Sequence, residues 1–108
     1  MEIKKATKGF AALSQETRLQ ILRRLVQAGP EGVSAGDMSI MTKVTASTLS
    51  FHLKELSQSE LILSERKGRT ILYKANYEGL QNLIHFLMAE CCQNNPDICA
   101  PFLAGPQK

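Results

Sequence analysis

Apolar residues in the first thirty positions recur every three or four residues, which is the spacing of amphipathic helices. They predict one helix over about residues 3–12 and a second helix that ends at Gly29 and Pro30. Ser14 is predicted to cap the second helix, because its hydroxyl can accept a hydrogen bond from a backbone N–H of the first turn. Glu16 then lies in that turn, where the helix dipole favours a carboxylate.

The next thirty residues predict two short helices joined by a tight turn. Ser34, followed three residues later by Asp37, resembles a capping box and predicts the start of a third helix. Thr45 is predicted to cap a fourth helix that runs from Ala46 to about Ser57. One face of this fourth helix is apolar and consists of Leu49, Leu53 and Leu56. Two short helices around a three-residue turn indicate a helix-turn-helix.

The pattern then changes to two β-prone runs at residues 61–66 and 69–74. Lys67 and Gly68 join them, and Gly68 can supply the positive φ of a tight hairpin turn. Asn76 is predicted to cap a long last helix, which Asn94-Asn95-Pro96 should end. The apolar stripe of this helix is Leu80, Leu83, Ile84, Leu87, Met88, Cys91 and Cys92.

Together these elements predict a mostly α fold with a β-hairpin wing, that is, a winged helix-turn-helix. A chain of 108 residues is one small domain, and a last helix that is apolar along its length needs a surface against which to be buried. We therefore expect a dimer.

Charge is unevenly distributed along the chain, although the net charge is only +3. Residues 43–75 carry six Lys or Arg against three acids, whereas residues 76–108 carry one against three. Within 66–74 no acid accompanies the cations Arg66, Lys67, Arg69 and Lys74. A basic middle suggests an anionic partner. No apolar run is long enough to cross a bilayer and no signal-peptide stretch is present, so we expect a cytoplasmic protein without a membrane partner.

The polar face of the fourth helix is the candidate DNA-reading surface. It consists of Ala46, Ser47, Thr48, Ser50, Phe51 and Lys54. Short hydroxyl side chains near a helix N-terminus can approach base edges, and an apolar ring can contact a thymine methyl. Lys54 and the wing residues Lys67 and Arg69 would neutralise phosphates. The alternatives are a solvated helix that happens to be rich in Ser and Thr, and a winged helix that binds another protein.

Three segments resemble the ArsR/SmtB family of bacterial metal- and metalloid-sensing repressors. They are residues 13–22 (LSQETRLQIL), 47–56 (STLSFHLKEL) and 68–73 (GRTILY). The resemblance implies a homodimer that pairs through its first and last helices, binds a palindromic operator and blocks transcription. Three positions depart from the family pattern. Thr42 and Lys43 stand where the family usually has an apolar residue and Gly, and Phe51 stands where many members have Arg or Gln.

All three cysteines, Cys91, Cys92 and Cys99, lie near the C-terminus. Three thiolates without His or carboxylate form a soft site that suits As(III) or Sb(III) as effector better than zinc, which prefers four ligands. Some ArsR-type repressors have a similar vicinal pair and a third cysteine. We therefore divide the chain into residues 1–93, the DNA-binding and dimerisation domain, and residues 94–108, a tail that contributes Cys99. Packing cysteines and a thiol redox or persulfide sensor are the alternatives.

The hypothesis that follows is a repressor that leaves DNA when the three thiolates bind the metalloid and change the spacing of the recognition helices. No Ser/His/Asp set, phosphate loop or paired carboxylates occur at a useful spacing, so we expect neither an enzyme nor a catalytic cofactor. His52 is expected to be packed or hydrogen-bonded in the recognition helix. His85 is expected to face solvent or an interface.

Overall fold

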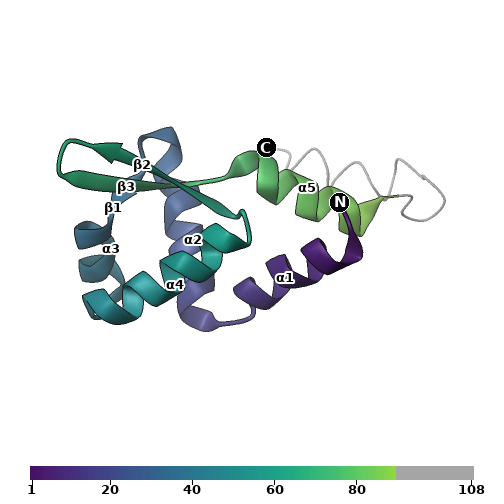
Figure 1. Ribbon diagram of the computed structural model, residues 1–108, viewed down its shortest axis with the longest axis horizontal. Helices are drawn as coiled ribbons and strands as arrows, with labels where there is room; N and C mark the ends of the chain where they lie inside the picture. The colour runs from purple at the N-terminus through teal and green to yellow at the C-terminus, as the bar shows by residue number, and fades with distance from the viewer. Residues whose placement is uncertain (90–108) are drawn as a thin grey trace, which may run out of the picture.

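The computed structural model describes residues 1–89 (Figure 1). In chain order its elements are α1 (Ile3–Leu13), α2 (Glu16–Ala28), the 3-10 helix η1 (Gly29–Glu31), β1 (Val33–Ser34), α3 (Ala35–Thr42), α4 (Ala46–Gln58), β2 (Ile62–Lys67), β3 (Thr70–Ala75) and α5 (Tyr77–Met88). The predicted order of helices and hairpin is confirmed, and so is the winged helix-turn-helix. None of the helices in the described part is long and apolar enough to cross a membrane.

Side-chain caps begin three of the helices where the sequence predicts them. Ser34 Oγ accepts a hydrogen bond from the backbone N–H of Asp37 at 3.1 Å, at the start of α3. Thr45 and Asn76 do the same for α4 and α5, with donors three residues later at 3.5 and 3.2 Å. These starts depend on residues within one turn of each other, which is why the local sequence predicts them.

The predicted cap at Ser14 is wrong. Ser14 ends α1, and its hydroxyl donates a hydrogen bond to the carbonyl of Ala11 at 2.9 Å. Gln15 caps α2 instead, with its Oε1 accepting from the backbone N–H of Arg18 at 2.9 Å. The glutamine amide has the same acceptor chemistry as a shorter cap, and it starts the helix one residue later than predicted.

The sheet has three antiparallel strands in the order β1-β3-β2. The predicted hairpin is confirmed, but its loop is Gly68-Arg69 rather than Lys67-Gly68, because Lys67 pairs with Thr70. Gly68 has a φ of 62°, which places the positive φ at the first loop position. The two-residue strand β1 was not predicted, since it is extended only through its pairing with Leu72 and Tyr73, about forty residues away.

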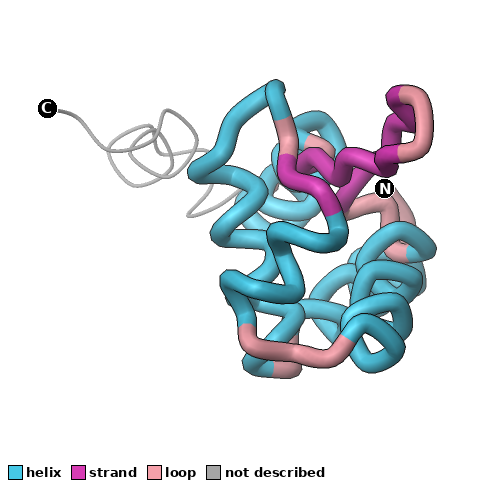
Figure 2. Tube along the Cα trace, turned by 90° about the vertical axis from the view of Figure 1, so that its left-hand side faces the viewer, coloured by secondary structure: helices cyan, strands magenta, loops and turns pink. Residues whose placement is uncertain are grey.

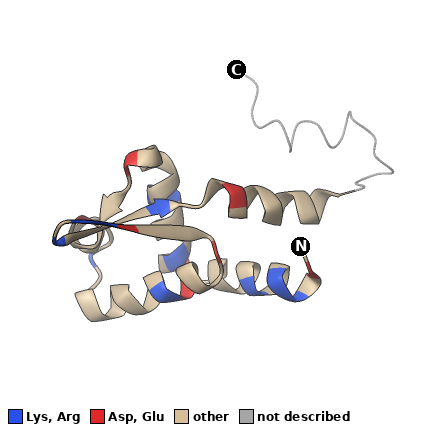
Figure 3. Cartoon of the chain, turned by 45° about the horizontal axis from the view of Figure 1, so that its top comes forward, with Lys and Arg blue, Asp and Glu red and all other residues tan. Residues whose placement is uncertain are grey.

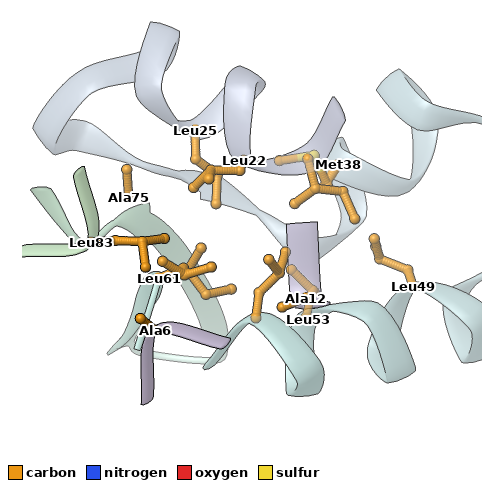
Figure 4. Packing of buried hydrophobic residues seen from close by; sticks show 13 residues of the cluster. Ala6, Ala12, Leu22, Leu25, Met38, Leu49, Leu53, Leu61, Ala75 and Leu83 are labelled. Carbon is orange, nitrogen blue, oxygen red and sulfur yellow. The ribbon is translucent and has the colours of Figure 1, made fainter. Parts of the chain in front are cut away.

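One apolar core joins the five α-helices to the hairpin (Figure 4). The predicted apolar face of α4 is buried in it, together with side chains from α1, α2, α3, β2 and α5. The large side chains with almost no exposure are Ile21, Leu25, Met38, Leu49, Leu56, Leu61 and Ile62. Burial on this scale fixes the orientation of α4, because close packing leaves few alternative arrangements.

Different helices and strands lie at the two ends of the molecule. In Figure 1, α1 and α5 lie side by side at the right-hand end, whereas α3, the wing tip and the start of α4 lie at the left-hand end. An added Cβ at Gly9 of α1 would lie only 3.2 Å from Leu83 of α5, so the two helices approach closely. In the side view of Figure 2 the hairpin loop stands clear of the helices.

Helix α5 ends at Met88, and Ala89 has an extended conformation with ψ of 133°. The prediction that this helix continues unbroken to Cys92 is therefore wrong at Ala89. Cys91, Cys92 and Cys99, and the predicted helix stop at residues 94–96, lie outside the described residues.

Candidate nucleic-acid interface

The side of α4 that faces away from the core is exposed along its length. All six predicted contact residues on this helix are exposed, namely Ala46, Ser47, Thr48, Ser50, Phe51 and Lys54. Phe51 is 56% exposed, so its ring is accessible on this face of the helix. Thr48 Oγ1 also accepts a hydrogen bond from Thr45 Oγ1 at 3.1 Å, which orients it at the helix start. The surface therefore combines short hydroxyls with one apolar ring, on a helix whose opposite side is buried in the core.

The wing supplies the positive charge at its tip (Figure 3). Lys67 ends β2 and Arg69 occupies the hairpin loop, and both side chains are exposed. Neither forms an ion pair with any residue in the described range 1–89. Both are therefore available to phosphate groups.

Lys74, another cation of the basic segment 66–74, is already paired with an acid. Its amine forms an ion pair with Glu65 of the neighbouring strand. The hydrogen bond from Lys74 holds the pKa of the Glu65 carboxyl below its ordinary value. The count of charges within 66–74 therefore overestimated the number of unpaired cations, because β-sheet pairing brings Glu65, from outside that run, to Lys74.

His52 lies on the buried side of α4 and is 7% exposed, as expected of a packed histidine. Its Nδ1 is 3.2 Å from Nη1 of Arg18, which comes from the first turn of α2. Burial, and then the positive charge of Arg18, lower the pKa of His52 below its ordinary value. Sequence reasoning missed Arg18. Both residues fall within the segments that carry the family resemblance, but no local spacing links two positions 34 residues apart.

The turn between α4 and the wing is bonded to both α1 and α5. Glu60 has a left-handed φ of 60°, and its carboxylate pairs with Lys5 of α1 at 2.5 Å. Its backbone carbonyl accepts a hydrogen bond from Asn76 Nδ2 at 2.8 Å, next to the start of α5. The hydrogen bond from Lys5 lowers the pKa of the Glu60 carboxyl. The end of α4 is therefore connected to α1 and to the start of α5.

Large apolar side chains remain exposed on α1 and α5. On α1, Ile3 is 67% exposed and Phe10 is also exposed, and on α5, Leu87 is 63% exposed and Ile84 about half exposed. Each pair is spaced to lie on one side of its helix. His85, on α5, is exposed as expected.

Among residues 1–89, no three His, Cys, Asp or Glu side chains are grouped so that they could hold a metal ion. The predicted effector ligands Cys91, Cys92 and Cys99 lie outside that range, so their convergence stays a prediction. The described part of the chain thus contains the exposed face of α4 and the wing cations that are predicted to contact DNA.

Comparison with known proteins bears on the function of this surface. A family model described as a helix-turn-helix domain matches residues 13–65, from the last residue of α1 into β2. The chain is 37% identical over 82 residues to the arsenical resistance operon repressor of Bacillus subtilis (strain 168), with 76% of each chain covered. It is 35% identical over 79 residues to the transcriptional repressor SdpR of the same strain, covering 73% of this chain and 84% of SdpR.

Among solved structures, an ArsR-like transcriptional regulator from Rhodococcus sp. RHA1 has a TM-score of 0.71 to this chain at 25% sequence identity. The alignment covers 97% of this chain and 96% of the Rhodococcus chain. Each of the three proteins is a regulator of transcription that resembles this chain over most of its length, which agrees with a DNA-binding protein rather than an enzyme.

Proposed function

The chain belongs to the ArsR/SmtB family of helix-turn-helix transcriptional regulators, and from this premise we propose that it is a homodimeric repressor released from its operator by trivalent arsenic or antimony. The observation that carries the repressor proposal is the exposed face of α4, where short hydroxyls and Phe51 are presented by a helix whose other side is buried in the core. Similarity to the arsenical resistance operon repressor supports the choice of effector.

In this proposal α4 enters the major groove and the wing follows the phosphate backbone. The hydroxyls of Ser47 and Ser50 are short enough to reach base edges, and Phe51 can contact a thymine methyl. Lys67 and Arg69 lie at the projecting wing tip, where their charges can neutralise phosphates. A protein that contacts phosphates in this way loses affinity as salt rises, with a slope of about −0.9 in log K against log salt for each phosphate.

The proposed dimer buries the exposed apolar side chains of α1 and α5 against a second copy. Ile3, Phe10, Ile84 and Leu87 would otherwise remain in contact with water on neighbouring helices. A two-fold symmetric dimer places two copies of α4 on one side of the duplex, about 34 Å apart for successive major grooves. The operator is then expected to be a palindrome.

The proposed effector site is the trio Cys91, Cys92 and Cys99. Trivalent arsenic has a lone pair and accepts three thiolate sulfurs. In arsenite the three As–S bonds would replace three As–O bonds, and the hydroxyls would leave with the three thiol protons as water. The site follows directly after α5, one of the two proposed dimer helices. A change in α5 can therefore alter the distance between the two recognition helices. A coupling of about 1–3 kcal/mol is typical of such linked sites.

The test is a titration of the reduced full-length dimer on a fluorescent DNA fragment that contains its operator, with arsenite, zinc or a mild oxidant. Arsenite should release the wild-type protein, whereas zinc should not. Cys91→Ser should bind DNA as wild type does but stay bound in arsenite. The matched control is His85→Asn, an exposed change on α5 that should leave the arsenite response intact.

Other outcomes separate the parts of the proposal. Release by oxidant alone, reversed by a dithiol reductant, would favour the redox sensor. Release of Cys91→Ser at the wild-type arsenite concentration would overturn the effector site and leave the repressor standing. Failure of the wild-type protein to bind DNA, or binding that does not depend on salt, would overturn the repressor itself.

A further inference from the structure

We propose that Arg18 and His52 are a positioning pair that holds α4 in its DNA-binding orientation, and that operator affinity falls when His52 takes up a second proton. This inference rests on the proposed DNA-binding function. It concerns residues that do not themselves face the DNA, since His52 lies on the buried side of α4 and Arg18 on α2 is half-buried.

One guanidinium joins three helices. Arg18 is in the first turn of α2, and its Nε donates a hydrogen bond to the carbonyl of Ala12 at 2.7 Å, near the end of α1. Its Nη1 lies 3.2 Å from Nδ1 of His52, in the middle of α4. The carbonyls at a helix end have no partner within the helix, so the bond to Ala12 also satisfies a group that would otherwise need water.

The contact determines which nitrogen of His52 carries the proton. Arginine has five N–H donors, no acceptor, and a charge that it does not lose in proteins. Nδ1 of His52 must therefore be the acceptor, which leaves the proton on Nε2 and the ring neutral. A second proton would occupy Nδ1, remove the acceptor and place two positive charges 3.2 Å apart.

The position of His52 on α4 makes the contact relevant to DNA binding. It follows Phe51 directly, and its ring centre is 5.6 Å from that of Phe51. Leu49 and Leu53, on the same side of the helix, are buried in the core. Since the DNA-facing residues share the same turns, a shift of the helix at His52 displaces them by a similar distance. Base contacts require accurate placement of short side chains, so they are sensitive to such a shift.

The charged groups that act on His52 are Arg18 of α2 and Glu55 of the next turn of α4. The other elements packed against α4 are α1, α3 and β2, and no charged group on them shifts the pKa of His52. Burial and Arg18 lower this pKa and Glu55 raises it, with a net lowering from the ordinary 6.5. The pair is therefore intact at neutral pH and opens as the pH falls below that value.

The experiment measures operator affinity of the full-length protein between pH 7.5 and 5.5 at constant ionic strength. The chain has two histidines, so the His52 variants and a His85→Asn control separate the titrating groups in this range. Wild type and His85→Asn should both lose about tenfold in affinity at the acid end. This direction is opposite to the general effect of protonation, which makes a DNA-binding protein more positive and strengthens binding.

His52→Asn is the conservative variant, because its amide oxygen can replace Nδ1 as acceptor and does not titrate. It should bind within about threefold of wild type at pH 7.5 and lose no affinity on acidification. His52→Leu removes the acceptor and should bind about tenfold more weakly at both pH values. A pH profile of His52→Asn that matches wild type would overturn the proposal, whatever the stability of His52→Leu.

A measurement without DNA keeps the inference separate from the proposed function. Nitrogen-15 NMR of the free protein at pH 7.5 should show Nδ1 of His52 without a proton and Nε2 with one. A proton on Nδ1 would overturn the pairing even if the protein binds its operator. If the expected tautomer is found but the wild-type protein binds no DNA at pH 7.5, the proposed function fails, and with it the role of the pair in DNA binding.

Discussion

Replacing Gly79 with Ala is expected to destabilise the protein, although the same change stabilises most helices. Gly79 is the third residue of α5, and an added Cβ would lie 2.2 Å from the backbone carbonyl oxygen of Glu60. Ordinary contacts of a Cβ begin near 3.4 Å, so the start of α5 and the turn after α4 must separate by more than 1 Å. Two hydrogen bonds of Asn76, to the carbonyls of Glu60 and Leu61, span this gap.

Three contributions set the change in the free energy of unfolding, of which two are destabilising and one is stabilising. Overpacking of this kind costs about 1–3 kcal/mol. Loss or lengthening of bonds at a helix start adds about 1 kcal/mol. The better helix propensity of Ala returns at most about 1 kcal/mol. The free energy of unfolding should therefore fall by about 1–3 kcal/mol, which lowers Tm by roughly 4–8 °C for each kcal/mol in a domain of this size.

Gly36 provides the matched control, because it is also in the first turn of a helix, α3. An added Cβ there meets nothing closer than Ser34 Oγ at 4.0 Å. Gly36→Ala should therefore stabilise the protein by about 0.4–1 kcal/mol. Urea unfolding followed by circular dichroism at one protein concentration measures both variants. A urea midpoint of Gly79→Ala that equals or exceeds that of Gly36→Ala would contradict the predicted clash with the Glu60 carbonyl.

Three further predictions concern the core, the turn of the helix-turn-helix and the wing. Leu56→Ala should lower the free energy of unfolding by about 3–5 kcal/mol, because Leu56 has no exposure, whereas the exposed Leu63→Ala should change it by less than about 0.5; urea midpoints will show whether the two differ. Lys43→Gly should raise Tm, since Lys43 has a left-handed φ of 57°, and an unchanged or lower Tm in a calorimetric scan would contradict this. Arg69→Gln should reduce the salt dependence of operator binding by about one unit of slope, and an identical slope would mean that Arg69 contacts no phosphate.

Much of the fold could be predicted from the sequence because its signals are local. The caps at Ser34, Thr45 and Asn76 act within one helical turn, and the apolar face of α4 repeats with the helical period. Where two local solutions have similar chemistry the prediction was less accurate. Ser14 and Gln15 both carry a side-chain oxygen that can cap a helix, and Gln15 is the residue that caps α2. The hairpin loop was displaced by one residue for the same reason, since Gly68 suits either of its two positions.

Some features of the candidate site can likewise be predicted from the local sequence, whereas others depend on the fold. The exposed residues of α4 follow from helical periodicity, so the sequence alone indicates them. The ion pair between Lys74 and Glu65 needs the strand register, which a count of charges along the chain does not contain. The three cysteines can be recognised as soft ligands from their identity, but whether their sulfurs converge depends on the path of the chain between them.

The order of the helices, the starts of α3, α4 and α5, the apolar side of each helix and the family similarity all follow from the sequence alone. Each of these depends on side chains within a few residues of one another or on a run of matching letters. Tertiary packing brings β1 into the sheet, Glu60 to Lys5 and Asn76, and Arg18 to His52. Those contacts join residues 16 to 55 positions apart, and they form only once burial of the shared core has brought the helices together.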